Sequence, residues 1–191
     1  MSQPVGVLLL ASGASRRFGS DKRLALLPSG QTLLEHMLAT IEGAGLPCRV
    51  TVQQGESLDI PPCKLELIRA NEGMASSIAE AVALLVNDFD ALMILPVDLP
   101  LLRSDTLTRL AHGAGRETLR RPVVDGKPGH PVVFGKSFYG DLQALAGEGG
   151  AQSVLNTHSQ RLEQVVVDDL GVYCDIDTPA ALRELIAQGV L

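Results

Sequence analysis

The residues after the first apolar run of the chain combine backbone freedom with positive charge. Gly13 and Gly19 let the backbone approach a ligand closely. Four cations lie in the same segment: Arg16, Arg17, Lys22 and Arg23. Such a loop suits a polyphosphate, which amides can wrap and cations can clamp. A solvent-exposed turn with surface basic residues is the other interpretation that these residue types allow.

The distribution of charge favours the phosphate-binding interpretation. Residues 1–23 carry four basic side chains and one acidic one, a net charge of +3. The rest of the chain carries 12 basic and 21 acidic side chains, a net charge of −9, so the whole chain has a charge of −6. The loop matches neither the Walker A pattern nor the GxGxxG fingerprint, so its spacing does not identify a nucleotide by itself.

Carboxylates that could hold a metal occur at two places. Asp98 follows an apolar run and lies between Pro96 and Pro100. A carboxylate at the end of a buried strand is costly unless solvated or paired, and Mg²⁺ prefers such hard oxygen ligands. A helix cap or a loop-fixing hydrogen bond is the structural alternative for Asp98.

Asp175 and Asp177 form the second place. They lie two residues apart on a segment that we expect to be extended. We expect only one of them to face a ligand. Asp177 could instead cap the last helix, because it precedes Thr178 and Pro179.

Small and polar residues mark three more candidate segments. They are Gly73, Ser76 and Ser77 in the first, Gly129 and His130 in the second, and Gly149 and Gly150 in the third. The first and third segments precede predicted helices, whose free amides suit an anion, although helix caps or flexible turns explain the same residues. His130 could equally be a turn residue.

The hydrophobic pattern between these residues predicts alternating strands and helices. The predicted strands span 5–10, 49–53, 65–69, 91–97, 131–134 and 163–167, and the predicted helices span 33–43, 75–86, a segment starting at 104 or 105, and 179–188. Thr32 and Glu35 have the spacing of a capping box, and Pro179 suits a first helical position. We interpret residues 120–135 as a loop that returns as a strand.

This alternation is typical of βα units. We predict an α/β fold over residues 1–191: a single-domain, three-layer α/β/α sandwich with a mostly parallel, Rossmann-like sheet. Ligands of such sheets bind beyond the carboxyl ends of the strands. The residues after Leu10, Arg69 and Val97 are therefore the expected site.

Composition excludes several classes of protein. With 46% apolar and 20% charged residues, the chain is globular rather than disordered. Its acidic balance and its few aromatic residues, four Phe and two Tyr, argue against nucleic-acid binding. The run from Val5 to Leu10 is too short to cross a membrane and lacks the features of a signal peptide. Three widely spaced cysteines fit neither a disulfide framework nor a metal site, so we expect a protein of the reducing cytoplasm. We also expect no membrane partner.

The sequence LLLASGASRRFGSDK at 8–22 resembles the opening motif of the MobA-like nucleotidyltransferases, most closely their MocA-like branch, the molybdenum cofactor cytidylyltransferases. Five further motifs extend the resemblance in order: GMASSI at 73–78, PVDLP at 96–100, GKPGHPVVFG at 126–135, GEGGA at 147–151 and DIDTP at 175–179. The resemblance implies a fold of the nucleotide-diphospho-sugar transferase type. Six ordered motifs make it specific.

The resemblance also implies roles for the candidate residues. The implied catalytic residues are Arg17, Lys22 and Asp98, with Arg17 and Lys22 on the triphosphate. The implied nucleotide-binding residues are Leu10, Ala11, Ser12, Gly13, Arg17, Lys22, Gly73, Ser76 and Ser77. The implied acceptor-binding residues are Gly129, His130, Gly149 and Gly150. Asp98 and Asp177 are the implied metal ligands, with Asp175 in reserve.

We therefore expect a Mg²⁺-dependent enzyme that transfers CMP from CTP to the phosphate of molybdopterin or molybdenum cofactor and releases pyrophosphate. An ionised acceptor phosphate is already a nucleophile, so no general base is needed. The alternatives are GTP as donor, a sugar or polyol phosphate as acceptor, and a non-catalytic protein that binds the cofactor for a molybdenum hydroxylase. Transient contact with such a hydroxylase is also expected of the enzyme.

Overall fold

The structure, a computed structural model, describes residues 5–13, 15, 17–58 and 63–191. Within these residues, eight strands form one mixed sheet: β1 (Val5–Leu10), β2 (Cys48–Gln53), β3 (Lys64–Leu67), β4 (Ala91–Pro96), β5 (Leu119–Val124), β6 (Lys127–Pro128), β7 (Val132–Gly135) and β8 (Glu163–Val166). The strand order is β3-β2-β1-β4-β7-β5-β6, and β8 pairs with β5. Strand β1 is parallel to β2 and β4, whereas β7 is antiparallel to β4 and β5.

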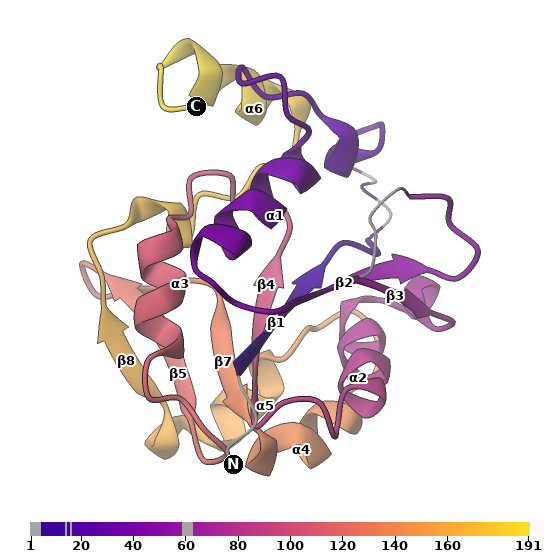
Figure 1. The fold of residues 1–191 in the computed structure, drawn as a ribbon, viewed down its shortest axis with the longest axis vertical. Coiled ribbons are helices and arrows are strands. Elements are labelled where there is room, and N and C mark those ends of the chain that lie inside the picture. Colours follow the sequence, from indigo (N-terminus) through magenta and orange to yellow (C-terminus); the bar gives the residue numbers. More distant parts are fainter. Residues whose placement is uncertain (1–4, 14, 16, 59–62) are drawn as a thin grey trace.

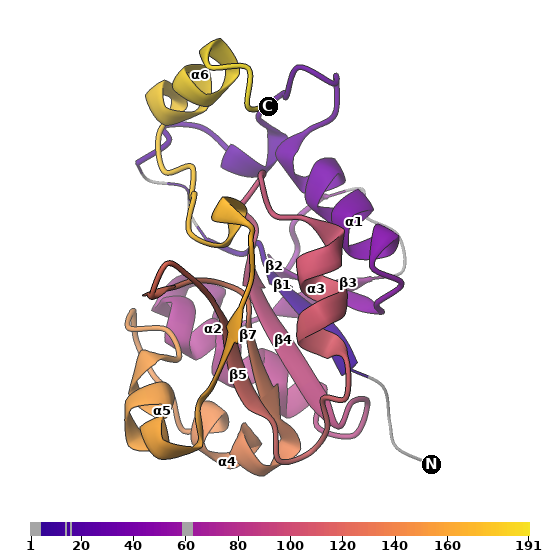
Figure 2. The same cartoon turned by 90° about the vertical axis from the view of Figure 1, so that its left-hand side faces the viewer.

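Helices cover both faces of this sheet (Figure 1). Helices α1 (Leu33–Gly43) and α3 (Ser104–Ala111) lie on one face, and α2 (Met74–Leu84), α4 (Tyr139–Gln143) and α5 (Gln152–Thr157) lie on the other. Helix α6 (Pro179–Ala187) lies beyond the carboxyl ends of β1 and β4, away from the other helices (Figure 2). This architecture confirms the predicted three-layer α/β fold. None of the described helices has the length and apolar character needed to cross a bilayer.

The sheet divides the main core into two layers. Along β1, Val7 and Leu9 pack on the side of α1, whereas Leu8 packs on the side of α2. All three side chains are fully buried. Burying such a side chain stabilises the fold by roughly 1.5–3 kcal/mol. Because both faces of the strand are covered, its residues form a continuous apolar run.

The helix ends follow the predicted signals. The Glu35 amide donates to Thr32 Oγ1 at 3.2 Å, and the Thr32 amide donates to the Glu35 carboxylate at 2.7 Å, which confirms the capping box. At α6, Pro179 occupies the first helical position and Thr178 is the cap. The interpretation of Asp177 as the cap of α6 is therefore wrong.

Residues 120–135 differ from the prediction, because most of them belong to the sheet rather than to a loop. Strand β5 includes Pro122, which has no amide proton and argues locally against a strand. Its carbonyl still accepts a hydrogen bond from the Gly129 amide at 2.9 Å, and β8 pairs with β5 in parallel. Pairing with strands distant in sequence outweighs the local effect of the proline.

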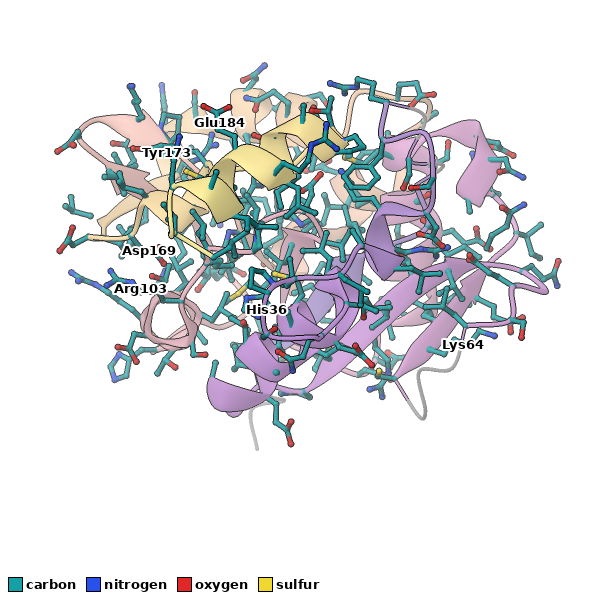
Figure 3. All side chains as sticks on the ribbon, turned by 90° about the horizontal axis from the view of Figure 1, so that it is seen from above. His36, Lys64, Arg103, Asp169, Tyr173 and Glu184 are labelled. Carbon is teal, nitrogen blue, oxygen red and sulfur yellow. The ribbon has the colours of Figure 1, made fainter. Side chains whose placement is uncertain are left out.

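The segment before α6 is tied to the start of α3. The buried carboxylate of Asp169 accepts hydrogen bonds from the Arg103 amide at 3.0 Å and the Thr106 hydroxyl at 2.6 Å. Figure 3 shows Asp169 and Arg103 side by side, with Tyr173 on the path towards α6. These bonds replace the lost hydration of a buried carboxylate. They fix the start of the segment that carries Asp175 and Asp177.

Candidate active site

The carboxyl ends of β1 and β4 lie side by side, because Leu10 pairs with Pro96 in the parallel ladder. Strands β2 and β3 extend the sheet on one side of β1, and β4 lies on the other. Ligands of open α/β sheets bind at such a switch point. The loop after Leu10 and the carboxylate of Asp98 meet there.

Lys22 lies between two carboxylates at this point. Its Nζ is 2.7 Å from Asp98 Oδ2 and 3.7 Å from Asp177 Oδ1, and Arg17 Nη1 is 2.5 Å from Asp177 Oδ2. We call these four residues the charged cluster. The side chain of Lys22 is 11% exposed and that of Arg17 is 78% exposed, so solvent screens the Arg17 pair more strongly. Arg16, another predicted cation, lies outside the described residues.

A backbone hydrogen bond brings Asp177 to Asp98. The Ile176 amide donates to the Asp98 carbonyl at 2.9 Å, and the buried Ile176 side chain packs against the loop after β1 and against α6. Asp177 then faces Lys22, whereas Asp175 is exposed and lies outside the charged cluster. The geometry therefore favours Asp177 over Asp175 as the carboxylate that works with Asp98.

Arg23 has a different role from the phosphate clamp suggested by its charge. Its buried guanidinium donates to the Ala11 carbonyl at 2.8 Å and pairs with the carboxylates of Asp21 and Glu56. These hydrogen bonds lower the pKa of both carboxyl groups. Arg23 thus ties together the two ends of the loop. Its partner Glu56 is 33 positions away, so charge counting along the sequence could not reveal this pairing.

A cavity of about 340 Å³ opens beside the charged cluster, and we call it the first cavity. Its walls include most of the predicted nucleotide and metal residues: Leu10, Ala11, Ser12, Gly13, Arg17, Lys22, Gly73, Ser77, Asp98 and Asp177. Other residues of its wall were not among the predicted site residues: Ser15, Phe18, Asn71, Met74 and Glu148. The charged side chains of its described walls are three cations and three carboxylates, which suit a phosphate ligand that arrives together with a metal cation.

Three hydroxyl groups connect this cavity to the sheet. Thr51 Oγ1 accepts from the Ala11 amide at 3.0 Å and donates to Ser12 Oγ at 3.3 Å. Ser12 Oγ in turn lies 3.4 Å from Ser77 Oγ. Thr51 is fully buried, and a buried hydroxyl requires such partners. Sequence reasoning missed Thr51, although a single polar residue among the buried residues of β2 was a usable signal.

Ser76, which was predicted to contact the nucleotide, does not line either cavity. The side chain is fully buried, and its Oγ accepts from the Gly147 amide at 3.1 Å. The Ala75 amide donates to the Gly147 carbonyl at 2.9 Å. Gly73 permits this approach: its φ is +112°, and a Cβ there would lie 2.5 Å from the Gly147 oxygen. Ser76 therefore holds residues 147–150 against the start of α2.

A second cavity, of about 260 Å³, adjoins the first. The two share part of their walls: Leu10, Met74, Pro96 and Glu148. The second cavity is otherwise largely apolar, with walls that include Ile78, Ile94, Val132, Phe134 and Leu155. Three of the predicted acceptor residues line it: His130, Gly149 and Gly150. The fourth, Gly129, instead packs against Val172.

His130 stands at the edge of the second cavity on the side of Asp98. The residue is exposed, yet protein atoms surround part of its ring, and this desolvation together with the positive charge of Arg121 lowers the pKa of His130. The carboxylates of Asp98 and Asp175 act in the opposite direction. His130 is therefore electrostatically coupled both to the charged cluster and to a cation on β5.

The donor set of the charged cluster fits a divalent cation shared with phosphate. Asp98 and Asp177 supply hard carboxylate oxygens, and Mg²⁺ commonly takes one or two protein carboxylates and completes its shell with substrate phosphates and water. No group of three or more potential ligands (His, Cys, Asp or Glu) gathers within the described residues. Two protein carboxylates leave the rest of the shell of such a cation to phosphate oxygens and water.

Comparison with known proteins identifies the family. MobA-like NTP transferase domains match residues 7–164. The chain belongs to this family. A MobA-like NTP transferase domain is a nucleotidyltransferase, so family membership confirms the resemblance to the MobA-like nucleotidyltransferases and the enzyme class.

Individual relatives of this MobA-like domain agree in length and fold. A probable molybdenum cofactor guanylyltransferase of Mycobacterium ulcerans is 26% identical over 197 residues, which cover 95% of this chain and 93% of that protein. The structure of Rv0371c from Mycobacterium tuberculosis has a TM-score of 0.83 at 22% identity and covers 98% of this chain and 99% of that one. Molybdopterin-guanine dinucleotide biosynthesis protein A from Archaeoglobus fulgidus has a TM-score of 0.70 at 20% identity and covers 96% and 99%.

Proposed function

We propose that this protein transfers a nucleoside monophosphate, CMP from CTP in the first instance, to the phosphate of molybdopterin or molybdenum cofactor. The observation that carries the proposal is the charged cluster, which lies beside the first of two adjoining cavities. A polar cavity next to a largely apolar one suits a triphosphate donor and a heterocyclic acceptor. The names of the relatives support a molybdenum cofactor substrate.

The charged cluster performs the donor half of the reaction. Arg17 and Lys22 bind the triphosphate and stabilise the charge that develops on the leaving pyrophosphate. Asp98 and Asp177 would hold Mg²⁺, whose chemistry is to neutralise the reacting phosphates. Lys22 already touches Asp98, so the group that binds phosphate lies within a few ångströms of the metal position.

The reaction joins the two cavities. An oxygen of the acceptor phosphate attacks the α-phosphorus of the triphosphate in line, a new P–O bond forms, and the bond to the β-phosphate oxygen breaks. The electron pair leaves with pyrophosphate. The acceptor oxygen is already ionised, so the site needs no general base, and no residue of the charged cluster is assigned that role.

The second cavity would receive the acceptor. Its apolar walls suit a flat heterocycle, and its few aromatic residues favour aliphatic and backbone contacts over ring stacking. His130, Gly149 and Gly150 lie on its walls, with Gly129 directly before His130. Helix α5 has only six residues, so Gly149 and Gly150 would act through their own loop amides rather than through a helix dipole.

Two observations point to different bases. The sequence Gly129-His130-Pro131 resembles the cytidylyltransferase branch and supports CTP. The names of two relatives, which refer to guanylyl transfer and to a guanine dinucleotide, support GTP. In either case the hydroxyls of Ser12 and Ser77 stand in the first cavity, where a base edge can meet them.

The test is pyrophosphate release by the full chain with each triphosphate, Mg²⁺ and molybdenum cofactor in turn. We expect release with CTP that depends on both Mg²⁺ and acceptor. Release with GTP alone would overturn the choice of base but not the reaction. Release only with a sugar or polyol phosphate would overturn the acceptor.

If no triphosphate supports pyrophosphate release above that of a protein-free control, the result favours the non-catalytic alternative. The protein would then be a cytoplasmic, single-domain carrier that hands the cofactor to a molybdenum hydroxylase. The variant Asp98→Ala distinguishes the enzyme from the carrier. An enzyme loses transfer in this variant, whereas a carrier has no transfer activity and keeps its affinity for the cofactor.

A further inference from the structure

Arg121 lies on the face of the sheet that forms the second cavity. In the ladder between β5 and β7, Leu119 pairs with Phe134, and both side chains belong to the core on the side of α2 and α5. Arg121 is two residues further along β5, so its side chain points to the same face. It therefore stands beside Val132, a wall residue of the second cavity, and one strand further out.

The charge of Arg121 has no acidic partner among the described residues. Its one hydrogen bond is a long one, from Nη2 to the Gly129 carbonyl at 3.3 Å. Its Nε is fully buried and has no hydrogen-bond partner in the part of the chain that the structure describes. Desolvation lowers the pKa of Arg121, which shows that the position is unfavourable for a cation. Most of the five guanidinium donors are thus left without a protein acceptor.

Three other partly buried cations of the described chain are paired. Lys22 meets Asp98, Arg23 meets Asp21 and Glu56, and Arg120 meets Glu163. Arg120 is the immediate neighbour of Arg121, and it also donates to two carbonyls on the opposite face of the sheet. An unpaired, desolvated guanidinium is costly unless an anion binds to it during function.

The surroundings of Arg121 indicate which anion. Arg121 holds the Gly129 carbonyl, which directly precedes His130, and its charge acts on the His130 ring. The negative charge of Asp98, which belongs to the cluster proposed to carry the reaction, also acts on the His130 ring. A group bound between Arg121 and His130 would therefore lie at the rim of the second cavity, on the path from that cavity to Asp98.

We propose that Arg121 binds the phosphate monoester of the acceptor, with its planar fork of donors taking two of the phosphate oxygens. This inference rests on the proposed function, because it assigns the second cavity to the acceptor. The fork geometry of a guanidinium matches phosphate and leaves a third oxygen free to face the charged cluster. Arg121 is thus a binding and positioning residue for the acceptor.

The test measures phosphate binding without turnover. Phenyl phosphate serves as a monoester probe, and the imidazole resonances of His130, assigned by comparison with His130→Asn, report its binding by NMR. We expect saturable shifts with a dissociation constant on the order of 1 mM. Arg121→Gln should weaken this binding about tenfold or more, and Arg121→Met should do the same while keeping the aliphatic stem.

The matched control is Arg109→Gln, which removes an exposed cation of α3 that has no partner among the described residues. It should change phenyl phosphate binding by less than about twofold, since exposed distant charges are screened. If Arg121→Gln and Arg121→Met bind the probe as the unchanged protein does, or if the probe never shifts His130, the inference is wrong. If neither neutral variant folds, Arg121→Lys decides: a lysine lacks the fork, so unchanged affinity would refute the assignment.

Steady-state kinetics keep this inference separate from the proposed function. Arg121→Gln should raise KM for the acceptor about tenfold or more and leave KM for the triphosphate within about twofold. Transfer with an unchanged KM for the acceptor would overturn the role of Arg121 and leave the proposed reaction standing. Absence of transfer in every variant would overturn the reaction, while the phenyl phosphate titration would still test the anion site.

Discussion

The two adjoining cavities differ in whether the cations near them are paired with carboxylates. In the first, Lys22 and Arg17 are paired with carboxylates of the protein itself. On the face of the sheet that bears the second, Arg121 has no acidic partner within the described residues. A cluster of paired charges is suited to bind a metal cation and a polyanion together. The metal cation can take the place of Lys22 and Arg17 beside the carboxylates, and the polyanion can take the place of the carboxylates beside Lys22 and Arg17. An unpaired cation is suited to take an anion alone.

The largest expected effect is that of Asp98→Asn, which removes the carboxylate most closely joined to Lys22. We expect transfer to fall by about 10³-fold or more, because charge stabilisation of the reacting phosphates depends on this group. The fold should persist, as judged by circular dichroism and thermal unfolding. Asp175→Asn is the matched control, since Asp175 is exposed and lies outside the charged cluster.

This pair of variants also tests the choice between the two C-terminal carboxylates. Asp175→Asn should keep transfer within about threefold of the unchanged protein, because its carboxylate lies outside the charged cluster and its exposure to solvent screens its charge. If Asp175→Asn lowers the transfer rate as much as Asp177→Asn does, the choice of Asp177 over Asp175 as the second carboxylate of the site is wrong. Single-turnover rates at saturating triphosphate are the measurement.

The next effect is at the boundary between the cavities. In Gly73→Ala the new Cβ would lie 2.5 Å from the Gly147 oxygen, at a backbone φ of +112°. The loop 147–150 must then move, and a displacement of about 1 Å in a site can cost about 10²-fold in rate. Gly113→Ala is the control: its φ is +67°, but nothing lies near its Cβ. Equal losses in both variants would mean that backbone strain, and not contact with the loop, is the cause.

A smaller effect is expected for Arg17→Gln. The Arg17 side chain is 78% exposed, so its contribution to binding a triphosphate is screened by solvent. We expect KM for the triphosphate to rise about tenfold, with KM for the acceptor unchanged. An equal rise for both substrates would remove the distinction between the two cavities.

The sequence predicted those parts of the molecule that depend on local signals. The strand from Val5 to Leu10, the Thr32 capping box and the first position of α6 follow from hydrophobic runs and helix signals within a few residues. Motif order placed the residues of the charged cluster in one site. Strand β5 was missed because Pro122 argues locally against a strand, and its pairing with β8 lies outside any local window.

The role of individual polar side chains was harder to predict for the same reason. Arg23 and Ser76 occupy the expected segments, but Glu56 and Gly147, their partners, are 33 and 71 positions away. Arg121 shows the converse case. Its neighbour Arg120 has the same charge and is paired with Glu163, so only the alternation of side chains across the sheet separates the two arginines.

The smallest effect concerns the scaffold of the first cavity at low pH. Arg23 lowers the pKa of Asp21 and Glu56, whose ordinary values are 3.8 and 4.5. Because the folded pKa values are lowered, this stabilisation is fully present above the unfolded values and is lost as pH falls through the folded ones. Both carboxyl groups are partly exposed, so the contribution is about 1 kcal/mol or less.

Arg23→Met should therefore remove part of the acid dependence of stability. The free energy of unfolding, measured in urea at about pH 5.5 and about pH 3, should fall less steeply with acid in Arg23→Met than in the unchanged protein. Arg109→Met is the control, since Arg109 is exposed and has no partner among the described residues. An identical slope in all three proteins would mean that the Arg23 pairs persist in the unfolded chain or contribute nothing. The first cavity would then owe its stability to packing rather than to paired charge.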